Sequence, residues 1–320
     1  MKALITGIRG FVAGYLAELL IDAGHEVWGT ARSIDSCRNA NSAYWDKVTL
    51  VKTDFNSQEA LETVLQASRP EVIFHLAAQS SVQQSWVDKE GTFNANLLGT
   101  VRLLEAVRKS GENPKVLLVG SAEEYGLVSP KEVPVKETNP LRPMSPYGAS
   151  KAATSMLAAQ YFRAYKIPII YARPFNHIGP RQSLGFVTSD FAKQIAEIEL
   201  GLLEPIIRVG NLEAQRDFTD VRDVVRAYYL LSQKGQPGEI YNVSSGQAVP
   251  IEYILQTYLE LAKVKISVEA DPARMRPSDV PILLGESNKL NIDTGWKVAV
   301  PLLKSLADVL EYWRLTVANR

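Results

Sequence analysis

The first 24 residues place the strongest constraint on how this chain can fold. They begin with an apolar run of strand length, Met1–Thr6, and continue through the small-residue sequence G-I-R-G-F-V-A-G at positions 7–14. Apolar residues then recur at helical spacing, and Gly24 stands where a helix C-cap is expected. A strand, a glycine-rich turn and a helix in this order form a site for a pyrophosphate. Small residues let the backbone approach the anion, and the helix N-terminus offers free N–H donors.

We therefore expect this turn to bind a dinucleotide cofactor. The expected contact residues are Gly7, Arg9, Gly10, Phe11 and Val12. The glycines are spaced three apart, which departs from the G-x-G-x-x-G of most dehydrogenases. A turn with only a structural role is the alternative, because glycines also mark turns that bind nothing.

Composition limits the classes of partner. The 320 residues are 46% hydrophobic and 22% charged with zero formal net charge, enough for a large core or for two domains. Zero net charge gives no electrostatic footprint for nucleic acid or an anionic membrane. Cys37 is the only cysteine and the three histidines are scattered, so we expect no disulfide and no metal site. With no signal peptide and no apolar run of membrane-spanning length, a soluble cytoplasmic protein is expected.

Apolar runs of strand length alternate with helical patterns through the first half. The runs are Lys2–Thr6, Glu26–Arg32, Val48–Asp54, Val72–Ala77, Lys115–Ser121 and Ile167–Pro174, with helical stretches such as Gln58–Ala67 and Leu97–Lys109 between most of them. This rhythm predicts an α/β fold, a Rossmann-type doubly wound parallel sheet. Ligands of such sheets bind beyond the carboxyl ends of the strands, so the residues after each strand are the candidates for a site.

The end of the second expected strand bears on the choice of cofactor. NAD-selective sites usually carry Asp or Glu there, but this chain has Arg32. Arg32 and Arg9 could receive a 2′-phosphate, which favours NADP(H), with NAD(H) possible; two ordinary surface arginines are the alternative. Asp54, followed by Phe55, is placed to accept from the adenine amino group, or it is only an acid before the next helix.

The fourth expected strand ends in small residues. Leu76, Ala77, Ala78 and Gln79 are expected to let the cofactor lie across the sheet edge. His75, inside the apolar strand, is interpreted as a packed core histidine rather than a catalytic one.

A tyrosine and a lysine four residues apart carry the expected chemistry. Pro146 suits the first turn of a helix, which puts Tyr147 and Lys151 on one face. A phenol is a poor acid–base catalyst at neutral pH unless a neighbouring cation stabilises the phenolate, and Lys151 can supply that cation by lowering the pKa of Tyr147. Ser121, after the fifth strand, can hold the substrate oxygen.

These motifs resemble the short-chain dehydrogenase/reductase superfamily: G7-x-x-G10-x-x-A13, Ser121 and Y147-x-x-x-K151. Tyr125-Gly126, Asn96 in NANLLGT and Arg173-Pro174-Phe175-Asn176 are similar to its extended branch, which acts on nucleotide sugars. The resemblance covers essentially the whole chain. It implies Ser121, Tyr147, Lys151 and Glu123 as catalytic residues. Tyr147 and Lys151 would also touch the cofactor, and Ser121, Glu123 and Tyr147 the substrate.

The second half loses the strict alternation, as expected of a smaller C-terminal substrate-binding domain. FNHIGPRQ and VGNLEAQRDF look like GDP-mannose 4,6-dehydratases and the neighbouring GDP-4-keto-6-deoxymannose reductases. That resemblance implies that Asn176, Lys193, Arg216 and Arg276 contact a nucleotide diphosphate, with guanine near Val187–Lys193 and Asn211. Asp217–Ser232 and Glu239–Ser244 are interpreted as a helix and a strand returning to the first sheet, and Leu302–Leu315 as a closing helix. The expected domains are residues 1–175 plus 218–245, and 176–217 plus 246–320.

Three functions compete. The first is a reductase that converts GDP-4-keto-6-deoxy-D-mannose into a GDP-6-deoxyhexose, with GDP-D-rhamnose the expected product. The second is a 4,6-dehydratase or 4-epimerase, and the third is a non-catalytic NADP(H) sensor, against which the intact Ser121, Tyr147 and Lys151 argue. Similar dehydratases carry Thr-Asp-Glu or Thr-Ser-Glu where this chain has Ser121-Ala122-Glu123, so Glu123 remains at the base position while Ala122 removes a polar partner. This loss favours the reductase, and the family resemblance implies a homodimer.

Overall fold

The computed structural model describes residues 1–34, 44–272 and 280–319. A seven-stranded sheet lies at its centre in the order β10-β6-β5-β4-β1-β2-β3, and every pairing in it is parallel. Its strands are β1 (Lys2–Thr6), β2 (Glu26–Ala31), β3 (Val48–Lys52), β4 (Val72–His75), β5 (Lys115–Val119), β6 (Ile169–Pro174) and β10 (Ile240–Val243). The predicted doubly wound α/β sheet is confirmed.

Helices cover both faces of this sheet, because its strands alternate the direction of their apolar side chains. Ala3 and Ile5 of β1 belong to one core cluster with α1 and α9, whereas Leu4 belongs to a second cluster with α3, α6 and α7. The helices concerned are α1 (Phe11–Asp22), α3 (Gln58–Ser68), α6 (Gly99–Ser110), α7 (Pro146–Tyr165) and α9 (Val221–Lys234). Shorter elements connect them: η1 (Trp45–Lys47), α4 (Val82–Val87), α5 (Lys89–Phe93), the π-helical η2 (Asn94–Leu98), η3 (Ala122–Glu124) and η4 (Pro130–Glu132).

The strand order reverses between β1 and β4. The chain leaves β1 toward β2 and β3 on one side and returns to β4, β5 and β6 on the other. Thr6 and His75 are partners at the carboxyl ends of these two strands. Such a switch point is where open α/β sheets bind ligands.

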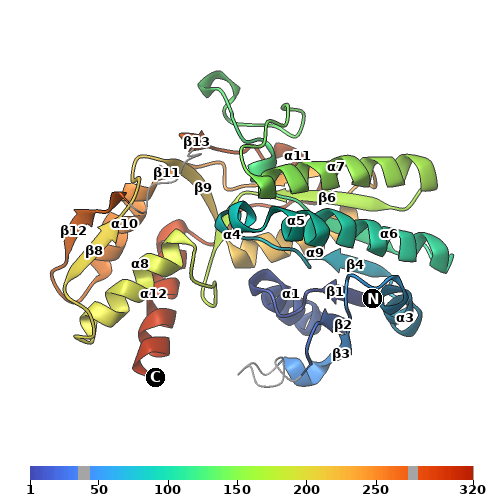
Figure 1. The fold of residues 1–320 in the computed structure, drawn as a ribbon, viewed down its shortest axis with the longest axis horizontal. Helices are drawn as coiled ribbons and strands as arrows, with labels where there is room; N and C mark the ends of the chain where they lie inside the picture. The colour runs from blue at the N-terminus through green and yellow to red at the C-terminus, as the bar shows by residue number, and fades with distance from the viewer. Residues whose placement is uncertain (35–43, 273–279, 320) are drawn as a thin grey trace.

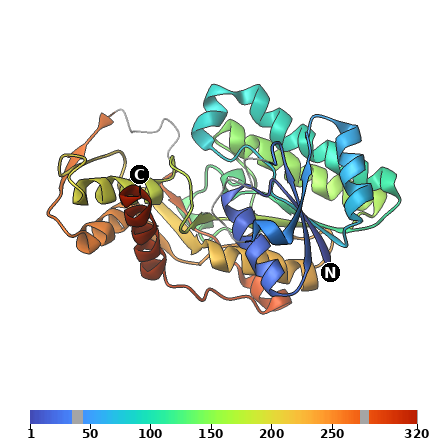
Figure 2. The same cartoon turned by 90° about the horizontal axis from the view of Figure 1, so that it is seen from below.

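The second half builds a smaller unit with its own core, at the left of Figure 1. A four-stranded sheet contains β7 (Asn176–Ile178), β9 (Gln215–Asp220), β11 (Ala248–Pro250) and β13 (Ile282–Leu283), and a parallel pair joins β8 (Ile206–Val209) to β12 (Ser267–Ala270). Their helices are α8 (Val187–Glu199), α10 (Ile251–Leu261) and α12 (Leu302–Ala318), whereas α11 (Asn288–Thr294) packs on α9. Figure 2 shows this unit beside the seven-stranded sheet.

Several predicted boundaries need correction. The strands predicted to end at Arg32, Asp54, Ala77 and Ser121 end one or two residues earlier, because their last residues turn into the loops above the sheet, and β6 begins at Ile169 instead of Ile167. The helix predicted over Asp217–Ser232 begins only at Val221, where Asp220 caps it, since residues 215–220 pair with β7, β11 and β13. Gly24 follows the C-cap residue Ala23 and takes the left-handed conformation. The closing helix is longer than predicted and ends at Ala318.

Within the described ranges, no helix combines the length and the apolar character needed to cross a membrane.

Candidate functional site

The glycine loop packs its backbone directly against the end of β4. Gly7 has φ +68°, and a Cβ there would stand 2.8 Å from the Cα of Ala77. The Gly7 and Ile8 N–H groups donate to Thr30 at the end of β2, and the Gly10 N–H donates to the Gly7 carbonyl. Gly10 is the N-cap of α1 and no acidic residue follows in the first turn. This close, side-chain-free approach at a helix N-terminus fits the pyrophosphate of a dinucleotide.

The other predicted cofactor residues surround this loop. Arg9 and Arg32 are exposed, and Val12 packs partly against the core. The Asp54 carboxylate accepts from the Asn56 N–H, and Ser57 caps α3. Phe55 stacks on His75 with ring centroids 5.6 Å apart. One face of the Phe55 ring therefore packs against the protein and is not available to a cofactor.

A buried hydrogen-bond chain orders the end of β4. The Thr6 hydroxyl accepts from the Leu76 and Ala77 N–H groups and therefore donates to His75 Nδ1, 2.8 Å away, while His75 Nε2 donates to Thr100 at 3.0 Å. Burial lowers the pKa of His75 to about 3, so the ring is neutral. The interpretation of His75 as a core residue is confirmed.

Asn96 joins this strand end to α7. Its side chain accepts from the Gln79 N–H and donates to the Gln79 carbonyl and to the Ser150 hydroxyl. Asn96 lies in the π-helical turn η2, an irregularity that often marks functional sites. The sequence singled it out only by resemblance.

Three of the predicted catalytic residues, Ser121, Tyr147 and Lys151, meet between η3, which carries the fourth, Glu123, and the start of α7. Ser121 caps η3, its hydroxyl accepting from the Glu123 N–H. Ser145 caps α7 and Pro146 is its first residue, as predicted, which places Tyr147 and Lys151 on one face. Tyr147 hydrogen-bonds with Ser121, and the Lys151 ammonium donates to the Val119 carbonyl at 2.7 Å. Both side chains are buried.

The predicted lowering of the pKa of Tyr147 is not observed. Burial raises it, the Ser121 hydrogen bond lowers it, and the charges of Glu123 and Glu124 raise it further. Burial also lowers the pKa of Lys151 to about 8, against the opposing effect of Glu124. Tyr147 is therefore protonated at neutral pH, which suits a proton donor.

The predicted substrate residues lie on the smaller unit. Asn176 is exposed on β7, Val187 begins α8, and Lys193 makes an ion pair with Glu197 at 2.6 Å. Asn211 accepts from the Glu213 N–H, and Arg216 on β9 donates to the Val280 carbonyl. Arg276 lies outside the described residues.

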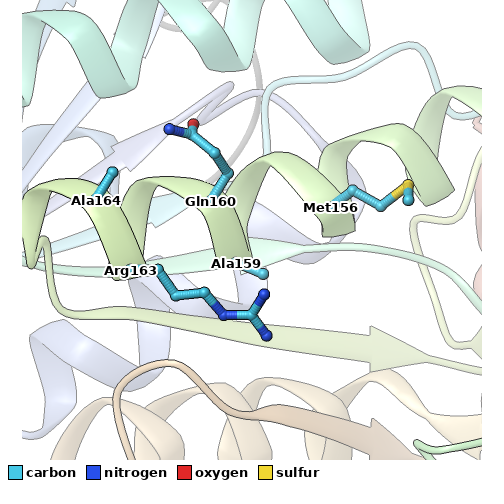
Figure 3. Close-up of a pocket in the computed structure, with 5 residues that line it drawn as sticks. All are labelled: Met156, Ala159, Gln160, Arg163 and Ala164. Carbon is cyan, nitrogen blue, oxygen red and sulfur yellow. The ribbon is translucent and has the colours of Figure 1, made fainter.

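A shallow hollow lies elsewhere on α7. It is lined by Met156, Ala159, Gln160, Arg163 and Ala164 (Figure 3). At 100° per residue these side chains centre on the side of the helix opposite Tyr147 and Lys151. The hollow is therefore separate from the candidate active site.

The sheet, the glycine loop and the Ser121–Tyr147–Lys151 arrangement define an extended short-chain dehydrogenase/reductase protein. A model of the family described as GDP-mannose 4,6 dehydratase matches residues 4–309, and the chain belongs to this family. A GDP-6-deoxy-D-mannose reductase of Pseudomonas aeruginosa is 33% identical over 99% of this chain and 98% of that protein. The human GDP-mannose 4,6 dehydratase is 31% identical over 93% of this chain and 87% of that protein.

Solved structures agree with the fold. RMD from Pseudomonas aeruginosa, complexed with NADPH, has a TM-score of 0.85 and 30% identity, covering 99% of this chain and all of that one. The Thermus thermophilus UDP-glucose 4-epimerase, complexed with NAD, has a TM-score of 0.87 and 29% identity, covering 98% and 99%. A nicotinamide cofactor is thus supported, and the two neighbours differ in which one they hold.

Proposed function

We propose that this chain reduces the 4-keto group of GDP-4-keto-6-deoxy-D-mannose to a GDP-6-deoxyhexose, with GDP-D-rhamnose as the product. The main support is the protonated Tyr147 hydrogen-bonded to Ser121, since reduction of a ketone requires a proton donor at the carbonyl oxygen. The full-length similarity to a GDP-6-deoxy-D-mannose reductase supports the same substrate.

In this proposal, Tyr147 protonates the oxygen on sugar C4 as charge develops on it, and the Ser121 hydroxyl holds the same oxygen by a hydrogen bond. Glu123, half-buried beside them, contacts the sugar. Lys151 supplies a buried positive charge near the developing alkoxide. A protonated Tyr147 needs no prior deprotonation, so the resting state of the site is already in the form that reduction requires.

NADPH, when bound, supplies the hydride. Gly7, Gly10 and the start of α1 would hold its pyrophosphate, and Ala77 and Ala78 would line its path over the sheet edge. Arg9 and Arg32 would receive the 2′-phosphate, which is why we propose NADPH over NADH.

The substrate would lie against the smaller unit, residues 176–217 plus 246–320, with the cofactor on residues 1–175 plus 218–245. In this division residues 218–220 complete β9 of the smaller sheet, and α11 packs on α9 of the larger unit. Arg216, Lys193 and Arg276 would hold the diphosphate, together with Asn176, and Val187 and Asn211 would meet the guanine. These contacts bind the nucleotide far from the reacting carbon, and they would orient sugar C4 toward the Tyr147 hydroxyl. Because Glu197 already pairs with Lys193, a bound diphosphate has to share or displace that ion pair.

A GDP-mannose 4,6-dehydratase is the second candidate. The family match and the retained Glu123 beside Tyr147 favour it. Ala122 argues against it, because its methyl group is buried with Tyr125, Phe175 and Leu283 and provides no polar partner for acid–base work.

The deciding experiment incubates the purified protein with GDP-4-keto-6-deoxymannose and NADPH, following absorbance and the product by NMR. Oxidation of NADPH with formation of a GDP-6-deoxyhexose is expected. Conversion of GDP-mannose into its 4-keto-6-deoxy form without added cofactor would assign the chain to the dehydratases instead.

We also propose a homodimer formed through the outer face of α7. Met156, which lines the hollow in Figure 3, is 73% exposed on this face. The resemblance to extended short-chain enzymes, which commonly dimerise through a four-helix bundle, supports a second copy as the partner.

A further inference from the structure

A fully buried ion pair lies directly behind the candidate catalytic residues. Glu124 Oε2 accepts from Arg173 Nε at 2.9 Å, and the two side chains are 0% and 1% exposed. Gly120 makes room for this carboxylate, since a Cβ at that position would stand 2.3 Å from Glu124 Oε1. Burying both charges is costly unless every polar group is satisfied. Here Arg173 also donates to the hydroxyls of Tyr125 and Ser155.

The other oxygen of Glu124 reaches two of the catalytic residues. Oε1 accepts from the Ser121 N–H at 2.8 Å and from the Tyr171 hydroxyl at 2.8 Å. The same hydroxyl lies 2.9 Å from the Lys151 carbonyl. One carboxylate thus holds the Ser121 N–H directly. The single proton of the Tyr171 hydroxyl, which Glu124 Oε1 and the Lys151 carbonyl can both accept, connects the same carboxylate to α7.

We propose, on the basis of the function proposed above, that Glu124 is the positioning residue of this site. It sets the spacing between Ser121 and Lys151 across η3 and α7, and its negative charge keeps the buried Lys151 cationic. Arg173 compensates that charge from the opposite side.

The ionisable groups around Lys151 and its neighbours Tyr147 and Glu124 come from five elements. Within the described residues they are His75 on β4, Glu123 and Glu124 on η3, Tyr147 on α7, Tyr171 and Arg173 on β6, and Tyr228 on α9. His75 is neutral, and burial raises the pKa of each of the three tyrosines. Glu124 opposes the effect of burial on Lys151, so its removal should lower the pKa of Lys151 below its present value of about 8.

Glu124→Gln tests the charge. The amide keeps an acceptor for Ser121 and Tyr171 but loses the negative charge. We expect kcat to fall about 10- to 100-fold, as for a displaced catalytic group, while KM for the GDP-sugar changes less. The alkaline limb of the pH profile of kcat should move to lower pH by at least about half a unit. A purely structural role would lower kcat without moving that limb.

Glu124→Asp separates position from charge, because it keeps the carboxylate and shortens its reach. Its kcat should fall while its alkaline limb stays in place; an undiminished kcat would overturn the positioning role. Glu132→Gln is the matched control, since it breaks the exposed Glu132–Arg142 pair of the adjacent loop. This control should leave both kcat and the limb unchanged.

A second readout uses the protein without cofactor or substrate. With lysine labelled at Cε by ¹³C, the Lys151 resonance, assigned by its loss in Lys151→Arg, should titrate at lower pH in Glu124→Gln than in the wild type. Equal midpoints would overturn the charge role. This measurement stands even if the wild type fails to reduce the keto sugar, in which case the proposed function alone is wrong.

Tyr171→Phe covers the case in which Glu124→Gln does not fold. It removes only the hydroxyl that bridges Glu124 to Lys151, and kcat should drop several-fold with an unchanged affinity for NADPH. Wild-type turnover in this variant would overturn the link between Glu124 and Lys151.

Discussion

The ring of Phe11 stacks on the imidazole of His177, with centroids 6.2 Å apart and planes inclined by 10°. Phe11 opens α1 in the glycine loop, whereas His177 lies on β7 of the smaller unit. The Tyr15 hydroxyl donates to the Pro180 carbonyl at 3.0 Å, and Arg181 makes a bidentate pair with Glu18 while its guanidinium lies over the Tyr15 ring. The proposed cofactor and sugar regions are therefore mechanically connected through α1.

Breaking this connection should affect substrate binding more than stability. Glu18→Gln removes a pair whose partners are both about one-third exposed, so we expect a loss of about 1 kcal/mol or less in the free energy of unfolding. KM for the GDP-sugar should rise several-fold, because the 177–182 segment leading to α8 loses an anchor. Glu62→Gln, which breaks the exposed pair with Lys109, is the control. Equal KM values in the two variants would contradict the connection.

Tyr147→Phe should abolish most turnover and spare binding. The ring and its packing remain, but the proton donor is lost, which typically costs 10²–10⁴-fold in rate. Steady-state kinetics and NADPH titration measure the two effects. Tyr253→Phe, on the exposed side of α10, should behave as the wild type. A near-normal kcat in Tyr147→Phe would mean that another group protonates the C4 oxygen.

Arg32→Ala should weaken the preference for NADPH. Removing a guanidinium from the 2′-phosphate should lower kcat/KM for NADPH about tenfold and leave that for NADH nearly unchanged. Lys131→Ala removes a positive charge from an exposed loop and serves as the control. A wild-type enzyme that prefers NADH would refute the proposal before any variant is made.

Stability should fall in acid because of His75. Its folded pKa of about 3 lies below the ordinary value of 6.5, so the unfolded state binds more protons below pH 6.5. The corresponding stabilisation is complete above pH 6.5 and is lost as pH falls toward 3, by up to about 1.4 kcal/mol per pH unit. Denaturant unfolding of His75→Gln between pH 7 and 5 should show a shallower slope than the wild type. Identical slopes would show that His75 does not titrate on unfolding.

Met156→Glu should produce a monomer. A carboxylate in place of the exposed Met156 carries a large desolvation cost once this face is covered by a second copy. Light scattering coupled to size exclusion measures the mass of each species. Leu303→Glu, on an exposed position of α12, should leave the mass of the wild type unchanged. A monomeric wild type would refute the homodimer.

Local patterns in the chain were sufficient to predict the sheet and the position of the main site. Strand length, glycine spacing and helical periodicity depend on neighbouring residues, and they located β1 through β5, the glycine loop and the Tyr147–Lys151 face of α7. Boundaries shifted by one to four residues where tertiary pairing took over, as at residues 217–220, which pair as part of β9.

Only the tertiary structure decided which groups surround the catalytic residues. Glu124 and Arg173 are 49 positions apart, and no periodicity marks either as a buried partner of the other. Likewise, Lys151 was expected to lower the pKa of Tyr147, because helix geometry places residues four apart on one face. In the structure its ammonium donates a hydrogen bond to the Val119 carbonyl on β5. Burial and long-range hydrogen bonds set the pKa values and the spacing of a site, and both depend on how distant segments pack.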